Sequence, residues 1–221
     1  MTNLRTDLAD YYERRAPHYD AIYTIPARQP DLRRLQGLIP TLLADRDVLE
    51  VAAGTGYWTQ VISTTARTVH ATDYNPTPLA IAATRDYPRQ NVRFDRADGF
   101  ALDHLPDTFT GAFVGFWWSH VLLDDIERFL RGLCSRLRPG STVVVVDNRY
   151  VEGSSHPITR TDTAGNTYQR RKLHDGTTHE VLKNFPTPPE LLNAARRHGT
   201  ASEILELDHY WVLTLTVPPT A

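Results

Sequence analysis

The sequence predicts an α/β fold with a doubly wound, mostly parallel seven-stranded sheet and an antiparallel strand near its C-terminal end. Three observations lead to this prediction. Short apolar runs alternate with stretches of helical spacing over residues 48–146. The first of these runs ends in a turn of small residues, Ala52-Ala53-Gly54-Thr55-Gly56. The chain closes with two apolar runs whose link is so short that the strands should be antiparallel neighbours.

The predicted elements follow in order along the chain. Two helices, 7–15 and 31–43, precede the alternating part, and Pro17 ends the first of them. The strands read as continuous apolar runs, as expected where helices cover both faces of a sheet. The predicted strands are 48–52, 68–72, 92–94, 112–117 and 142–146, and the helices that follow them are 57–65, 78–85 and 125–137.

The pattern changes after residue 147. Residues 149–165 are polar and show no periodicity, whereas two alternating runs, 167–173 and 178–185, flank an Asp-Gly turn. This arrangement predicts a β-hairpin insertion over 149–186. A helix over 188–198 and strands 204–207 and 210–217 complete the chain. We expect one domain over 1–221, with a helical N-terminal part at 1–45.

The composition excludes several classes of protein. Of the 221 residues, 41% are hydrophobic and 23% are charged, as is usual for a globular domain, and no apolar run is long enough to span a membrane. The net charge of -2 does not suggest a nucleic-acid partner. Because Cys134 is the single cysteine, no internal disulfide is possible, and the N-terminus lacks a secretory pattern. We therefore expect a cytoplasmic location.

The first strand and its turn predict a site for a nucleoside cofactor. Small residues allow the backbone to approach a ligand where a Cβ would intrude. Asp73 closes the second apolar run about 20 residues after the turn, where an acid can bind ribose hydroxyls.

Four features in this order resemble the class I S-adenosylmethionine (SAM)-dependent methyltransferases that act on small molecules. They are the 50–56 loop, Asp73 after the second strand, Asp98-Gly99-Phe100 after the third, and the Leu-x-Pro-Gly turn at 137–140. The resemblance covers roughly residues 7–217 and implies a Rossmann-like methyltransferase fold. One departure is that Ala52 stands where the family usually has its first glycine.

The resemblance implies a role for each matching residue. The small residues of the loop would lie under the methionine part of SAM, Glu50 would orient the loop or reach the amino group through water, and Asp73 and Asp98 would accept from ribose and adenine. Residues 1–45 would form a lid, with tyrosines over the cofactor and the acceptor. The expected cofactor residues are Tyr11, Tyr19, Glu50, Ala52, Ala53, Gly54, Gly56, Asp73, Tyr74, Asp98, Gly99, Phe100 and Trp117.

The predicted binding site for the methyl acceptor consists of residues that can take up a proton or form an aromatic wall. His120 follows the fourth strand at the edge where open α/β sheets bind ligands, and it is the candidate general base for O- or N-methylation. It could instead cap a helix or bind the cofactor carboxylate. Trp117 and Trp118 alternate, so that one can face the core and one the pocket. Trp118, His156 and His18 are the expected acceptor-binding residues.

Other interpretations of the sequence predict different features. A metal-dependent methyltransferase would add an acid after the fourth strand to Asp147-Asn148, but Trp118-Ser119 stands there, so no metal is expected. Tyr168-x-x-x-Lys172 has the spacing of a dehydrogenase pair, but lies in a predicted strand. An NAD(P)-dependent oxidoreductase would have a third glycine where Thr59 stands. A third interpretation is a cofactor-binding protein of the same fold without catalytic activity. The hairpin could also pair with a second subunit through its edge and form a homodimer.

Overall fold

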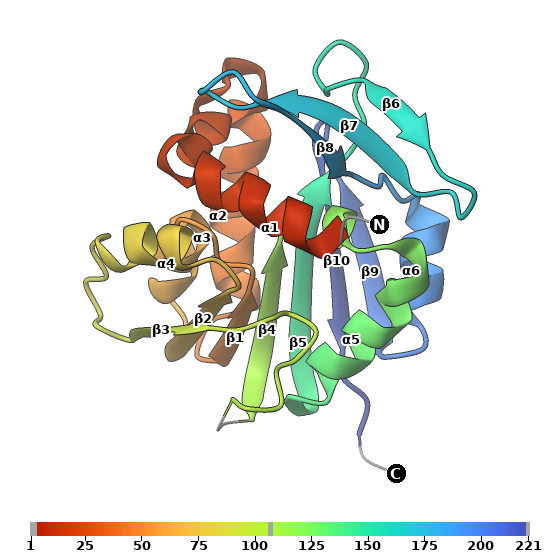
Figure 1. The fold of residues 1–221 in the computed structure, drawn as a ribbon. Coiled ribbons are helices and arrows are strands. Elements are labelled where there is room, and N and C mark those ends of the chain that lie inside the picture. Colours follow the sequence, from red (N-terminus) through yellow and green to blue (C-terminus); the bar gives the residue numbers. More distant parts are fainter. Residues whose placement is uncertain (1–3, 106–107, 220–221) are drawn as a thin grey trace.

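The computed structural model describes residues 4–105 and 108–219, and its centre is a seven-stranded sheet (Figure 1). The strand order is β3-β2-β1-β4-β5-β10-β9, in which β10 runs antiparallel to both of its neighbours and the first five strands are parallel. This topology confirms the predicted fold class. The strands are β1 (Asp47–Val51), β2 (Thr68–Asp73), β3 (Val92–Arg96), β4 (Phe109–Gly115), β5 (Leu137–Asn148), β9 (Thr200–Glu206) and β10 (Tyr210–Thr216).

Helices cover both faces of this sheet. The helices α2 (Gln29–Leu42) and α3 (Tyr57–Ser63) pack on one face, with α4 (Pro76–Ala83) beside them, and α5 (Ile126–Cys134) and α6 (Pro188–Ala195) pack on the other (Figure 1). The alternation of side chains along the strands decides the partner of each residue: Leu49 and Val51 face α5, whereas Val48 faces α2 and α3.

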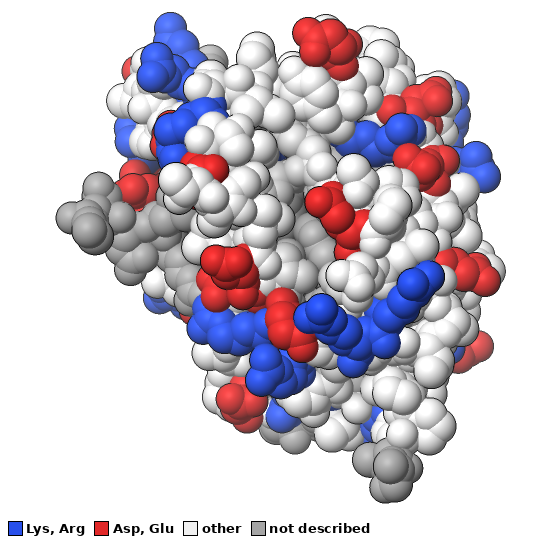
Figure 2. All heavy atoms as spheres, turned by 90° about the vertical axis from the view of Figure 1, so that its right-hand side faces the viewer, with Lys and Arg blue, Asp and Glu red and all other residues white. Residues whose placement is uncertain are grey.

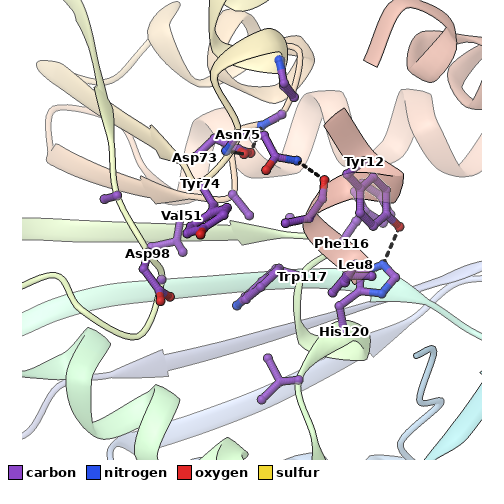
Figure 3. A pocket seen from close by; sticks show the side chains of 18 of the residues that line it. Leu8, Tyr12, Val51, Asp73, Tyr74, Asn75, Asp98, Phe116, Trp117 and His120 are labelled. Carbon is purple, nitrogen blue, oxygen red and sulfur yellow. Dashed lines mark hydrogen bonds between the residues drawn. The ribbon is translucent and has the colours of Figure 1, made fainter. Parts of the chain in front are cut away.

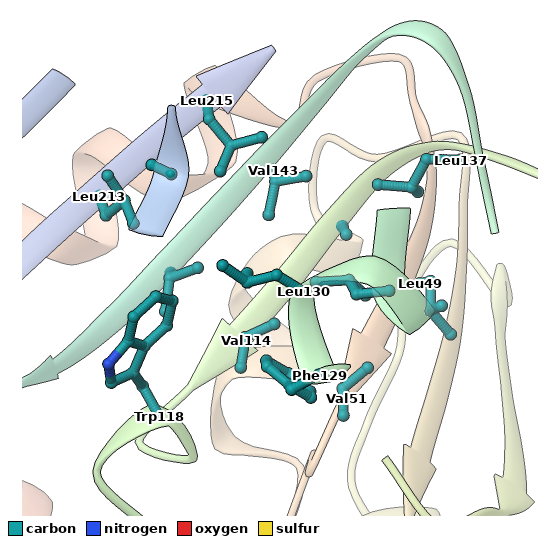
Figure 4. Packing of buried hydrophobic residues seen from close by; sticks show 14 of the residues in the cluster. Leu49, Val51, Val114, Trp118, Phe129, Leu130, Leu137, Val143, Leu213 and Leu215 are labelled. Carbon is teal, nitrogen blue, oxygen red and sulfur yellow. The ribbon is translucent and has the colours of Figure 1, made fainter. Parts of the chain in front are cut away.

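The core beneath α5 shows why the central strands have no polar face. Phe129 and Leu130 of α5 pack against Val114 and Val143, and all four side chains are fully buried (Figure 4). Burial of one such side chain stabilises the fold by about 1.5–3 kcal/mol. Since the opposite face of β5 is covered as well, the whole run 143–146 is apolar and buried.

A second, three-stranded antiparallel sheet lies above the carboxyl ends of the central strands. It consists of β6 (Ile158–Thr161), β7 (Thr167–Lys172) and β8 (Thr178–Leu182). The helix α1 (Leu4–Arg15) passes between the two sheets (Figure 1), and its Leu8 and Tyr11 pack on Leu173 and Val181. The predicted hairpin is confirmed as β7 and β8. The sequence did not indicate β6 because all four of its residues are exposed.

Several predicted boundaries were wrong by a few residues, for local reasons. The strand predicted over 112–117 ends at Gly115 because Phe116 adopts a left-handed backbone (φ 58°) that turns the chain out of the sheet. The helix predicted over 125–137 ends at Cys134, since Leu137 already pairs with Phe109 in β5. After α1, residues 16–24 continue as a 3-10 helix, Ala16–Thr24, which the sequence did not indicate.

The helix lengths and the surface charges can be compared with the expectation that neither a membrane nor a nucleic acid is a partner. None of the helices described in residues 4–105 and 108–219 is both long and apolar enough to cross a bilayer. On the face drawn in Figure 2, basic and acidic side chains are interspersed, and a band of basic side chains across its lower half is interrupted by acidic ones.

Candidate functional site

A cavity of about 450 Å³ lies at the carboxyl ends of β1, β2, β3 and β4, below α1. The loop after each of these strands contributes side chains to it, and α1 contributes Leu8, Ala9 and Tyr12 (Figure 3). Open α/β sheets bind ligands at this edge, where the strand order reverses. The reversal here lies between β1 and β4, which flank the cavity.

The loop after β1 has a backbone that departs from ordinary L-residue geometry. Ala52, Gly54 and Gly56 all have positive φ angles, of 58°, 58° and 79°. A Cβ on Gly56 would come within 2.8 Å of the Ala82 Cβ, so only glycine allows α4 to approach there. The loop therefore turns tightly and presents main-chain atoms to the cavity.

Asp73 ties the ends of β1 and β2 together. Its two carboxylate oxygens accept the backbone N–H groups of Gly54 (2.8 Å) and Asn75 (2.9 Å). Each oxygen keeps a further lone pair for a ligand hydroxyl. Burial raises the pKa of Asp73, and the two N–H donors oppose this effect. The carboxylate is thus fixed at the rim of the cavity as an acceptor, as binding of a ribose requires.

The far end of the cavity suits a flat ring. Asp98 accepts the N–H of Phe100 at 2.9 Å, and the rings of Phe100 and Trp117 meet edge to face at 6.4 Å. A Cβ on Gly99 would lie 3.0 Å from Val51 Cγ1, so a larger residue would crowd this end. Asp98 thus stands beside an apolar slot as an acceptor for a ring amino group.

Glu50 lies beneath the loop and does not line the cavity. It is buried, and burial raises its pKa to about 8. Its Oε2 has no hydrogen-bond partner among the described residues. At neutral pH this carboxyl is therefore mostly protonated, unless a nearby cation stabilises its charge.

The near end of the cavity holds a hydrogen-bonded pair, Tyr12 and His120 (Figure 3). His120 Nδ1 lies 2.6 Å from the Leu182 carbonyl oxygen, which can only accept, so Nδ1 carries the proton. Nε2 then accepts the Tyr12 hydroxyl at 2.7 Å. Burial, with the charges of Lys183 and Arg171, holds the pKa of His120 well below its usual value. The imidazole is therefore neutral at neutral pH, with Nε2 unprotonated, and it is a weaker base than an exposed histidine.

Below this pair, Lys183 and Asp147 form a buried ion pair of 2.9 Å, and Lys183 also donates to the Ser119 hydroxyl. Burial lowers the pKa of Lys183 to about 8 against the opposing effect of Asp147. Burial alone would raise the pKa of Asp147, but Lys183 and His120 bring it below its usual value. Asp147 also accepts the N–H groups of Ser119 and Asn148. The Asp147 carboxylate, which a metal-dependent enzyme would use as a ligand, is thus hydrogen-bonded to groups of the protein.

A second cavity, of about 370 Å³, adjoins α1 on the side of the small sheet. Tyr12 connects the two cavities, because it lines the first and lies 3.4 Å from Arg171 of the second. The residues that line the second cavity are Tyr11, Arg14, Arg15, His18, His156, Arg171, Lys172, Leu173 and His174.

The structure brings most of the sequence-predicted site residues to one of these cavities. Ala53 and Gly56 belong to the loop without lining the first cavity, and Trp118 is buried in the core against Trp211. Tyr11, His18 and His156 line the second cavity. Those that line the first are Tyr19, Ala52, Gly54, Asp73, Tyr74, Asp98, Gly99, Phe100, Trp117 and His120.

Sequence reasoning missed Tyr12, Arg15, Arg171 and Lys183 as members of the site. One signal was available for Lys183: it is one of only two lysines in the chain and directly follows the apolar pair 181–182. The two arginines carried no such signal, because arginine is common in this sequence.

Comparison with known proteins agrees with this geometry. Residues 48–140 match the family described as a methyltransferase domain. The solved complex of DhpI with SAH is 29% identical, with a TM-score of 0.77 over all of both chains. The DhpI–SAM–HEP complex is 30% identical, with a TM-score of 0.76 over 97% of this chain and 98% of that one.

A curated relative, the probable SAM-dependent methyltransferase Rv3030 of Mycobacterium tuberculosis, is 38% identical over 111 residues. The matched part is 50% of this chain and 38% of the relative, so this chain spans well under half the length of that protein. The CcbJ methyltransferase of Streptomyces caelestis shares the fold, with a TM-score of 0.69 over 96% of this chain and 99% of that one at 19% identity.

Fold and site together define a nucleoside-cofactor protein of the doubly wound class. The chain belongs to the class I SAM-dependent methyltransferases, and its cofactor is SAM. The resemblance of the sequence to the class I SAM-dependent methyltransferases is thereby confirmed.

Proposed function

We propose that this chain transfers the methyl group of SAM to an oxygen or nitrogen atom of a small-molecule acceptor. The observation that carries the proposal is the Tyr12–His120 pair, which stands at the end of the cavity opposite Asp98. In this proposal residues 1–45 act as a lid and 149–186 as an insertion that completes the acceptor side. A cavity roofed by α1 and the small sheet favours a small molecule over a polymer.

The residues present fit SAM, and each would hold a different part of it. The carboxylate of Asp73 would accept from the ribose hydroxyls and that of Asp98 from the adenine amino group, while Trp117 and Phe100 would flank the base. The main chain at 52–54 would support the methionine part. When bound, SAM supplies a methyl group that its sulfonium makes electrophilic. The protein then has mainly to hold the acceptor atom in line, about 3–3.5 Å from that methyl.

His120 is the group that can take up the acceptor's proton. Its Nε2 is unprotonated, and its low pKa keeps it so at neutral pH. Because Tyr12 donates to this nitrogen, either an acceptor hydroxyl replaces Tyr12 there or the Tyr12 hydroxyl passes the proton on. For the variant His120→Ala, a fall in kcat with unchanged SAM affinity supports the role of base, whereas an equal loss of both supports a role in cofactor positioning.

One experiment separates this proposal from its alternatives. We would titrate the protein calorimetrically with SAM, S-adenosylhomocysteine (SAH) and NAD, and then assay SAH release with a panel of small acceptors. Binding of SAM and SAH, with methylation of an acceptor, is the expected result. Binding of NAD alone would indicate an oxidoreductase. Binding of SAM without transfer to any acceptor would indicate an inactive binding protein.

A further inference from the structure

The charged side chains that line the second cavity are all basic. Its ionisable residues are arginines, a lysine and histidines, and neither Asp nor Glu is among the residues that line it. Acidic side chains compensate only part of this charge: Arg14 pairs with Asp175 at 2.5 Å. An acid-free concave surface with several arginines is a favourable place for an anion.

Of the three arginines that line this cavity, Arg15 and Arg171 have no carboxylate partner among the described residues. Arg171 donates to the Gln169 side-chain oxygen (2.7 Å) and lies 3.4 Å from the Tyr12 hydroxyl. Arg15 donates to the Tyr11 hydroxyl (3.1 Å) and lies over the ring of Tyr19. Both guanidinium groups are only partly exposed. Two half-buried cations held by neutral groups keep most of their capacity to bind an oxyanion.

The titratable groups around the arginines are affected by this excess of positive charge. His156 has a pKa lowered by burial and then by Arg171 and Arg15. Arg171 also contributes to the lowered pKa values of Lys183 and His120, after burial in both cases. Two carboxylates beside these groups are already paired, Asp147 with Lys183 and Asp175 with Arg14. An anion in the second cavity would relieve the repulsion among all of these groups.

The two cavities meet at two tyrosines. Tyr12 and Tyr19 line the first cavity, while Arg171 contacts Tyr12 and Arg15 lies over Tyr19 from the second. A single small molecule can therefore place one group beside the arginines and another beside His120.

We propose that Arg15 and Arg171 bind a negatively charged oxyanion of the methyl acceptor, a carboxylate or a phosphate-type group, and so orient its nucleophile towards His120. This inference rests on the proposed function, because it assigns the acceptor of that same reaction. The planar guanidinium forks match the two or three oxygens of such a group. The site thus selects acidic acceptors over neutral ones of the same shape.

The first test measures anion binding without turnover. Inorganic phosphate and acetate are titrated calorimetrically into the SAH complex of the wild type, of Arg171→Met and of Arg170→Met. Arg170 is the matched control, because it is the preceding residue of β7, is exposed and does not line the cavity. We expect anion affinity to fall at least tenfold in R171M and to stay unchanged in R170M, with SAH affinity equal in all three. Stronger binding of phosphate or of acetate then identifies the type of oxyanion.

Equal anion affinity in the wild type and R171M would overturn the inference. Since R171M could disturb the fold, Arg171→Lys provides a second variant that keeps the charge and loses the fork. Its anion affinity should lie between those of the wild type and R171M, and an R171K affinity no higher than that of R171M would contradict the assignment.

The second test separates this inference from the proposed function. Hydroxy acids and their amides are assayed as matched acceptors by SAH release. We expect the acids to have the higher kcat/KM and R171M to lose this preference through a raised KM. Amides methylated as well as acids would overturn the oxyanion site and leave methyl transfer intact. Arg171-dependent phosphate binding without transfer to any acceptor would support the site and reject the proposed function.

Discussion

The Tyr12 hydroxyl donates a hydrogen bond of 2.7 Å to His120 Nε2 and thereby joins the N-terminal helix to the loop that follows β4. The two residues are 108 positions apart in the chain. The bond satisfies the one imidazole nitrogen that the Leu182 carbonyl does not reach.

Replacement of Tyr12 by phenylalanine should weaken the fold and the reaction together. His120 Nε2 would lose its donor in a buried place, which costs about 1–3 kcal/mol of unfolding free energy. The orientation of His120 would loosen, so that kcat falls more than SAM affinity. Urea unfolding and SAH-release kinetics measure the two effects. The control is Tyr150→Phe, because the Tyr150 hydroxyl donates to the exposed Glu152. A Y12F protein as stable and active as the wild type would contradict this account.

Asp73→Asn should weaken SAM binding by about tenfold to a hundredfold. A hydrogen bond from a ligand hydroxyl to a charged acceptor contributes about 1.5–3 kcal/mol, and the amide removes that charge. Calorimetric titration with SAM measures the loss. The exposed Asp86→Asn provides the control and should bind SAM as the wild type does. An unchanged affinity in D73N would show that Asp73 does not bind the ribose.

Ala52→Gly should stabilise the protein by about 1 kcal/mol, because Ala52 has a φ of 58°, which costs an L-residue about 1–2 kcal/mol. The matched variant Ala83→Gly, at the end of α4, should destabilise it by up to about 1 kcal/mol. Urea unfolding of both proteins gives the two free energies. Shifts of the same sign would show that the backbone at residue 52 is not strained.

The stability of the ligand-free protein should depend on the protonation of Glu50. Its pKa rises from the ordinary value of 4.5 to about 8 on folding, so the folded state binds the proton more tightly than the unfolded chain. Stability therefore falls as the pH rises between about 4.5 and 8, by up to about 1.4 kcal/mol per pH unit. Glu50→Gln should remove this contribution. Urea unfolding at several pH values measures it, and parallel curves for the wild type and E50Q would disprove the shift.

The sequence predicted those parts that depend on local patterns. The run 143–146 is apolar on both faces because helices cover both, and Asp73 ends β2 at a spacing set by one βαβ unit. The alternation of Trp117 and Trp118 also sends one ring to the cavity and one to the core. Their functional roles stay predictions.

The parts that the sequence did not predict depend on contacts between distant segments. Arg15 and Arg171 line the same cavity because the small sheet packs on α1, and no local pattern in either segment predicts that packing. The strand β6 is exposed throughout, so no apolar alternation marks it. The periodicity of apolar residues predicts which positions are buried. It does not predict a site that is assembled from exposed or half-buried polar residues.

The position of α1 has a consequence for the order of events in turnover. The helix is tied to the cofactor loops, where Ala9 accepts from the Asn75 side chain at 2.8 Å, and to the small sheet through Arg14 and Asp175. One displacement of this helix would therefore open both cavities at once. We expect SAM and the acceptor to enter, and the products to leave, through this one opening step, with the departure of the helix limiting the steady-state rate.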